Sequence, residues 1–190
     1  MVLLLSIIQL SKQIFVVLRS RVKAEVLFAA SFLFIILLGA VLLRLPNATY
    51  EGISFMDALF TSTSAVCVTG LTVVDTGATF TLTGQVVLLM LIQVGGIGVM
   101  TFTSFFAMSF LSGTSFHDQF MMKNLLNEAS LSDIFRTVVY IILTTFIIEG
   151  IGVYLVYMQV QDVAEIDNKL FFALFHGVSA FCNAGFSTLP

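Results

Sequence analysis

Charged residues are scarce in this sequence of 190 residues. Lys, Arg, Asp and Glu together make up 10% of the chain, whereas hydrophobic residues make up 58%. Soluble globular domains carry about 25% charged residues, so the composition argues against an ordinary water-soluble domain. The mean hydropathy of +1.07 agrees with this. We therefore expect lipid to be the main solvent of this chain.

Cysteine is equally scarce, because the chain has only Cys67 and Cys182. Both lie in apolar runs at matching places of a repeat, which does not favour a disulfide framework. His117 and His176 lack companions at metal-ligand spacing, and no nucleophile and base pair occurs at a workable spacing. We therefore expect a protein that is not an enzyme, with no cofactor, no metal centre and no nucleic-acid partner.

Long stretches contain no charged residue at all. The run 26–43 matches the roughly 20 apolar residues that cross a bilayer as one helix. Another run, 76–117, is too long for one helix and too short for two helices with a loop. A third segment, 134–159, is also mainly apolar. We expect spanning helices in all three regions, the second within 80–111.

Charge asymmetry predicts the orientation. Basic residues cluster before the first apolar run and after the second, at Lys12, Arg19, Arg21, Lys23, Lys123 and Arg136. The segments 45–75 and 161–168 carry only acidic charges, at Glu51, Asp57, Asp75, Asp162, Glu165 and Asp167. The positive-inside rule places the basic regions in the cytoplasm. The prediction is a multi-pass protein of the plasma (inner) membrane with a cytoplasmic N-terminus.

An internal repeat relates 58–71 to 173–186 at an offset of 115 residues, without gaps. Seven of the fourteen pairs are identical, and Phe, Ser, Cys and Gly are among them. Each copy also follows an apolar helix and a short acidic connection, which favours duplication. The predicted fold is an all-α membrane protein of repeated helix–pore loop–helix units, each with a short re-entrant helix.

The repeat divides the chain into four parts. We expect an N-terminal cytoplasmic or interfacial segment at 1–24, a first unit at 25–112 and a cytoplasmic connection at 113–133. The second unit, 134–190, is truncated after its loop.

Polar residues predict where the two short helices begin. Ser54 and Asp57 have capping-box spacing in the first unit, and Asp167 and Asn168 offer caps in the second. Each helix should end near its cysteine, because a glycine that tolerates positive φ follows three residues later.

Backbone that leaves helical geometry inside a membrane exposes carbonyl groups, each costing several kcal/mol if it faces lipid. A dehydrated cation satisfies such carbonyls, and the negative end of each short helix points toward the same place. We name 67–70 the first loop segment and 182–185 the second. The predicted cation-binding residues are Cys67, Val68, Thr69, Gly70, Cys182, Asn183, Ala184 and Gly185.

Two alternatives remain open. In the first, the re-entrant segments bind a solute in a secondary transporter, although such transporters use inverted repeats and both loops here enter from outside. In the second, Gly70 and Gly185 are packing glycines of a non-catalytic membrane helix bundle. Gly95, Gly96 and Gly98 lack the strand of a nucleotide fingerprint and indicate helix packing or a hinge.

Glu149 lies within the third apolar segment, where a charged side chain costs about 3 kcal/mol. It should therefore face protein. It is either a buried partner near the pore or subunit contact, or a neutral or hydrogen-bonded structural carboxylate beside Gly150 and Gly152.

Three stretches resemble one known family. The sequence DALFTSTSAVCVTGLTVVDTG at 57–77 is similar to the first pore loop of the Trk/Ktr/HKT superfamily of potassium transporters. Residues 91–98 and 176–187 resemble its glycine-rich helix and second pore loop. The resemblance implies potassium uptake through a filter of backbone carbonyls, formed by four units in a polypeptide of more than twice this length.

The same resemblance implies a pair of such subunits and a cytosolic nucleotide-binding regulatory subunit. Two departures stand out, since Cys67 and Cys182 replace the hydroxyl or amide side chains that are more frequent in the family. Some members that favour sodium carry serine where this chain has Gly70, so glycine here implies potassium.

Overall fold

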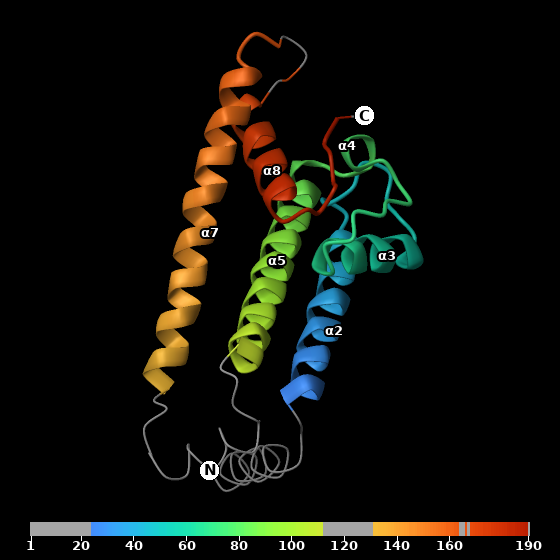
Figure 1. Cartoon of the computed structure of the whole chain (residues 1–190). Coiled ribbons are helices and arrows are strands. Elements are labelled where there is room, and N and C mark those ends of the chain that lie inside the picture. Colours follow the sequence, from blue (N-terminus) through green and yellow to red (C-terminus); the bar gives the residue numbers. More distant parts are fainter. Residues whose placement is uncertain (1–23, 112–130, 164–165, 167, 190) are drawn as a thin grey trace, which may run out of the picture. The chain divides into compact units, whose positions relative to one another are not determined.

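The computed structural model describes residues 24–111, 131–163, 166 and 168–189 (Figure 1). Its elements are all helices, in agreement with the predicted all-α class, and one isolated antiparallel bridge joins Thr49 and Phe80. The helices are α2 (Ala24–Leu43), α3 (Phe55–Val66), α4 (Thr76–Thr79), α5 (Leu82–Leu111), α7 (Leu131–Gln159) and α8 (Lys169–Phe181).

The chain divides into two compact units, Met1–Ile35 and Ile36–Pro190. The described part of the first is the beginning of α2, where the rings of Phe28 and Phe32 lie 4.5 Å apart. The second contains all other described helices. Nearly all of the predicted N-terminal segment 1–24, and the predicted connection 113–133 up to residue 130, lie outside the described residues.

Two of the described helices are long and apolar enough to cross a membrane. They contain the stretches Leu82–Thr101 and Val138–Gln159, with mean hydropathies of 1.9 and 2.1. The apolar part of α2, Phe28–Leu43, is shorter than this criterion requires. Large apolar side chains such as Met90 and Ile147 are more than 60% exposed, as expected for surfaces that face lipid.

The two short helices begin at the predicted caps. In α3 the Ser54 hydroxyl accepts a hydrogen bond from the Asp57 amide at 3.1 Å and donates one to the Asp57 carboxylate at 2.8 Å. In α8 the Asn168 side-chain oxygen accepts from the Phe171 amide at 3.1 Å. These bonds satisfy amides that a helix start leaves without partners. Asp167, the other predicted cap, lies outside the described residues.

Glycines allow the helices to pack closely around the two loops. Gly177 of α8 faces the backbone of Val153 in α7, Gly95 of α5 faces the Val66 carbonyl at the end of α3, and Gly96 faces Cys182. A side chain at any of these positions would collide with its neighbour. The prediction of helix packing for the glycine-rich stretch of α5 is therefore confirmed at Gly95 and Gly96. In Figure 1, α8 lies alongside both α5 and α7, with which it is in contact.

Candidate functional site

The chain leaves helical geometry directly after α3. Cys67 is the C-cap, and its amide donates to the Thr63 carbonyl at 2.8 Å. The Val68 amide then donates to Ala65 at 3.3 Å, and the Thr69 amide reaches back to Ser64 at 3.0 Å. This pair of backward bonds is a Schellman motif, which closes a helix with one residue in left-handed conformation.

The end of α8 repeats this arrangement bond for bond. The amide of Cys182, again the C-cap, donates to the Val178 carbonyl at 2.9 Å. The Asn183 amide donates to Ala180 at 3.0 Å and the Ala184 amide to Ser179 at 2.7 Å. The residues equivalent by sequence therefore have equivalent backbone geometry.

Positive φ angles occur at the same two places in each loop segment. They are 56° at Val68 and 75° at Gly70, and 58° at Asn183 and 68° at Gly185. Asparagine and glycine tolerate this region, but a β-branched residue such as valine rarely occupies it. Such backbone strain concentrates at functional sites, which makes Val68 a marker of one.

The two loop segments lie against each other although 115 residues separate them. A Cβ atom on Gly70 would be 2.7 Å from the Ala184 carbonyl oxygen and 3.3 Å from the Cα of Gly185. A Cβ on Gly185 would be 3.3 Å from the Cα of Gly70. The structure thus brings both sets of predicted cation-binding residues to one place.

The amides of 67–69 and 182–184 donate hydrogen bonds backward, whereas the carbonyls of both loop segments accept none among the described residues. No group in the described part of the chain donates a hydrogen bond to the carbonyl oxygens of 67–70 or 182–185. Each segment follows the C-terminal end of a helix, where the dipole is negative. Free oxygens at the negative end of a helix suit a cation better than an anion.

Side chains support the two segments in different ways. In the first, the Thr69 hydroxyl donates to the Ser64 hydroxyl at 3.1 Å. In the second, the buried Ser179 hydroxyl donates to the Phe186 carbonyl at 2.8 Å. The His176 ring adds contacts from Nε2 to the Ser187 hydroxyl at 3.2 Å and the Thr188 amide at 3.4 Å.

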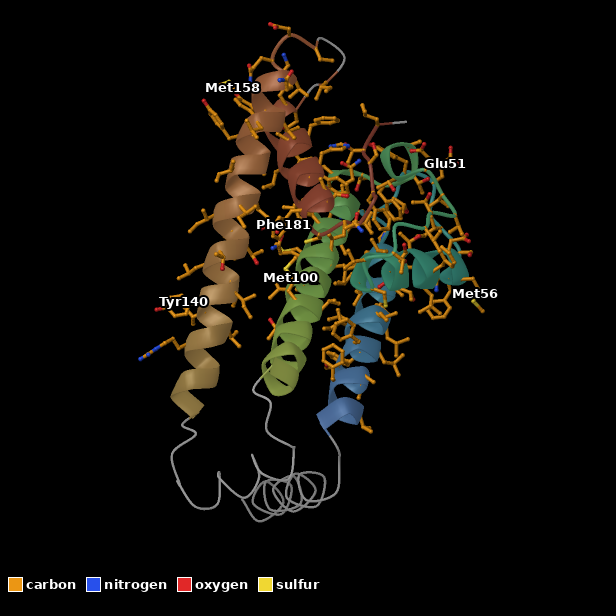
Figure 2. The ribbon with its side chains drawn as sticks, viewed as in Figure 1. Glu51, Met56, Met100, Tyr140, Met158 and Phe181 are labelled. Atoms are coloured by element: carbon orange, nitrogen blue, oxygen red, sulfur yellow. The ribbon has the colours of Figure 1, made fainter. Side chains whose placement is uncertain are left out.

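A buried carboxylate touches the start of the second loop segment. Glu149 of α7 is 3% exposed, and its two oxygens accept from the Gln93 Nε2 of α5 at 2.9 and 3.0 Å. The Cys182 thiol donates to the same carboxylate at 3.8 Å. Figure 2 labels Phe181 at the end of α8, the residue that precedes Cys182 in the sequence. The prediction that Glu149 faces protein is confirmed.

Sequence reasoning missed four supporting residues, namely Gln93, Ser179, and the two residues that the His176 ring contacts, Ser187 and Thr188. Gln93 carried a detectable signal, because it is an amide within the charge-free run 76–117. Ser179 is one of the identical pairs of the repeat, which marked its position without predicting its bond to Phe186.

The described part of the chain thus combines two helices of membrane-spanning length with two matching short helices that end in free carbonyls, an arrangement typical of helical membrane proteins. A family model described as "TrkH: Cation transport protein" matches residues 16–190. The chain belongs to this TrkH family of cation transport proteins, whose members are membrane proteins.

Individual relatives agree with the family. The chain is 40% identical over 162 residues to the Ktr system potassium uptake protein B of Bacillus subtilis, covering 85% of this chain and 36% of the relative. It is 43% identical over 158 residues to the protein of that name from Vibrio alginolyticus, covering 83% and 34%.

A third relative is the potassium/sodium uptake protein NtpJ of Enterococcus hirae, 38% identical over 175 residues, with 90% of this chain and 38% of that protein covered. The chain therefore spans little more than a third of the length of these relatives.

Proposed function

We propose that this chain contributes two of the segments that form a potassium-selective filter in a potassium uptake protein. The observation that carries the proposal is the contact between the loop segments, with free carbonyls in both and Gly70 against the Ala184 oxygen. Carbonyl rings that replace the hydration shell of an ion are the basis of potassium filters. The names of the relatives favour potassium as the ion.

The cation-binding atoms in this proposal are the backbone oxygens of Cys67, Val68, Thr69, Gly70, Cys182, Asn183, Ala184 and Gly185. The amides of 67–69 and 182–184 are bonded backward into their helices, so the oxygens of the same peptides, including those of Cys67, Val68, Cys182 and Asn183, point away from the helix ends. Binding then depends on backbone orientation, and a thiol at Cys67 or Cys182 is compatible with it. Potassium itself is cargo and no resident cofactor is required.

The proposal extends to the organisation of the whole protein. We infer repeated helix–pore loop–helix units, with boundaries at 25–112 and 134–190, in a multi-pass plasma-membrane protein with a cytoplasmic N-terminus. Four units surround one pore, two full-length subunits pair, and a cytosolic nucleotide-binding subunit regulates them. Membership of the family and the short acidic outer connections support this organisation.

Potassium-limited growth tests the proposal directly. The full-length protein that carries this chain is produced in cells lacking their own potassium uptake, and Gly70→Ser is compared with Gly150→Ala. A Cβ on Gly150, in α7, meets nothing within 4 Å, so this control should grow like the parent. Gly70→Ser should abolish growth at low potassium, because its Cβ collides with the neighbouring loop segment.

Rubidium uptake separates this function from the alternatives. A potassium filter passes rubidium, and excess potassium should compete with it while organic solutes should not. Uptake of an organic solute that Gly70→Ser abolishes would favour a secondary transporter instead. Growth and rubidium uptake that do not respond to Gly70→Ser would refute the proposal.

A further inference from the structure

Glu149 is the most deeply buried carboxylate among the described residues, and it has no basic partner there. Its neighbours are Gln93 of α5 and Cys182 at the end of α8, both of which donate hydrogen bonds to it. An isolated buried charge is costly, so it persists only where its interactions repay the cost. A structural role alone would be served by an uncharged amide.

Through its hydrogen bonds, this carboxylate of α7 links α5 and α8 at the start of the second loop segment. Cys182 is both the C-cap of α8 and the first residue of the second loop segment. Gly96 lets α5 approach the cysteine side chain, and Gly95 lets the same helix approach Val66 at the end of α3. The rotation of Cys182, and hence the direction of the carbonyls that follow it, is fixed from α5 and α7 at once.

The first loop segment has no equivalent anchor in the described structure. Cys67 is exposed, whereas Cys182 is buried. The residue that precedes Glu149 by the repeat offset is Phe34, which cannot accept a hydrogen bond. The carboxylate is therefore a feature of the second unit alone and is no general requirement of the repeated loop.

We propose that Glu149 is a positioning residue for cation selection, which orients the second loop segment through Cys182 and shares this task with Gln93. This inference rests on the proposed filter function. The carboxylate also contacts Cys182 at the start of that segment, and in a medium of low dielectric constant an ionised carboxylate favours cation occupancy nearby. The role is specific to transport because it acts on the geometry and charge of the ion site.

Transport kinetics test the inference in the full-length protein. We expect Glu149→Gln to raise the KM for rubidium by about tenfold, the loss expected when a hydrogen-bonded charged group is neutralised, and to lower discrimination against sodium. The amount of protein in the membrane should be unchanged. Thr145→Val, one turn away in α7 and equally buried, is the matched control and should leave KM as it is.

Two further variants keep the test sharp if Glu149→Gln reduces the amount of protein. Exchange of the pair in Glu149→Gln/Gln93→Glu retains one carboxylate and one amide and should recover most of the lost affinity. Cys182→Ala removes the thiol donor, and its effect on KM should not add to that of Glu149→Gln, because both act through one contact.

The outcomes separate this inference from the proposed function. Rubidium uptake that is sensitive to Gly70→Ser but keeps its KM and sodium discrimination in Glu149→Gln would overturn the inference alone. Fully additive effects of Cys182→Ala and Glu149→Gln, or uptake that falls only in proportion to the amount of protein, would overturn it as well. No uptake sensitive to Gly70→Ser would instead refute the filter.

Discussion

The two loops have the same backbone but different side-chain support. Both short helices end at cysteine, close with the same backward hydrogen bonds and place positive φ at the same offsets. The first is fastened mainly through its helix, where the buried Ser62 hydroxyl donates to the Ile36 carbonyl at 2.7 Å. The second is fastened through Ser179, His176 and Glu149.

The comparison distinguishes the residues that the loop geometry requires in both units from the residues that support the loop in only one of them. The shared part is carried by the residues that are identical in the repeat, above all Ser64 and Ser179, Cys67 and Cys182, and Gly70 and Gly185. Further support comes from positions that differ, such as Ser62, His176 and Glu149. The loop backbone is thus compatible with more than one set of anchors, and substitutions should affect the two loops unequally.

The largest effect should come from the two glycines that face each other. Gly70→Ala should abolish rubidium uptake, because its Cβ would lie 2.7 Å from the Ala184 oxygen. Gly185→Ala should leave more activity, since its nearest contact is 3.3 Å. Gly52→Ala is the control. Gly52 also has a positive φ, of 81°, but a Cβ there meets nothing within 4 Å, so this variant measures only the backbone cost of about 1 kcal/mol. Equal loss in all three variants would show that φ matters and the contact does not.

The serine pair should give the next largest effect. Ser179→Ala removes the buried donor to Phe186 and should lower the free energy of unfolding by about 1–2 kcal/mol. Ser64→Ala should cost less, because the Thr69 hydroxyl retains the Ser64 carbonyl as a second acceptor at 3.4 Å. Thermal unfolding of both variants in detergent measures the difference. A larger loss for Ser64→Ala would reverse the comparison.

Thr61 and His176 occupy equivalent repeat positions and should respond in opposite directions. The Thr61 hydroxyl is buried and has no hydrogen-bond partner in the part of the chain that the structure describes, so Thr61→Val should be neutral or stabilise the protein by about 1 kcal/mol. His176→Phe keeps a ring but removes the contacts to Ser187 and Thr188, and should destabilise by a similar amount. Unfolding temperatures of the two variants provide the check, and destabilisation by Thr61→Val would point to an unrecognised partner of its hydroxyl.

The smallest effect should distinguish Val68 from Asn183. Val68→Gly relieves a β-branched residue at φ 56° and should stabilise the folded loop by about 1 kcal/mol. Asn183→Gly should change the free energy of unfolding by only roughly a few tenths of a kcal/mol, because asparagine already tolerates this conformation. Unfolding measurements on both variants, with uptake assayed in parallel, show whether the strain at Val68 is needed for transport. Equal responses would remove Val68 as a strained position.

Local features of the fold were predictable from sequence, since they depend on few neighbouring residues. Capping residues at Ser54 and Asn168 and the helix ends at Cys67 and Cys182 follow from short-range hydrogen bonding. The offset of the repeat predicted that both loops share one geometry. The charge-free runs located α2 and α5, and the apolar segment 134–159 located α7, although α7 begins at Leu131, slightly before the predicted start at 134.

Contacts between distant helices could not be predicted in the same way. The contact between Gln93 and Glu149 depends on how α5 and α7 are rotated about their axes. A helix that is apolar on all sides has no polar stripe to indicate this rotation. The positive φ at Val68 was unexpected for a related reason, because only the surrounding packing can hold valine in that region.

The backward bonding of the amides has one more consequence. At Cys67, Val68 and Thr69, and again at Cys182, Asn183 and Ala184, every peptide hydrogen is already engaged within its own helix end. A chloride ion entering between the loops would thus meet lone pairs and no donor from these peptides. At these six peptides the hydrogen-bonding pattern of the main chain itself disfavours anions, whatever the charge of the nearby side chains.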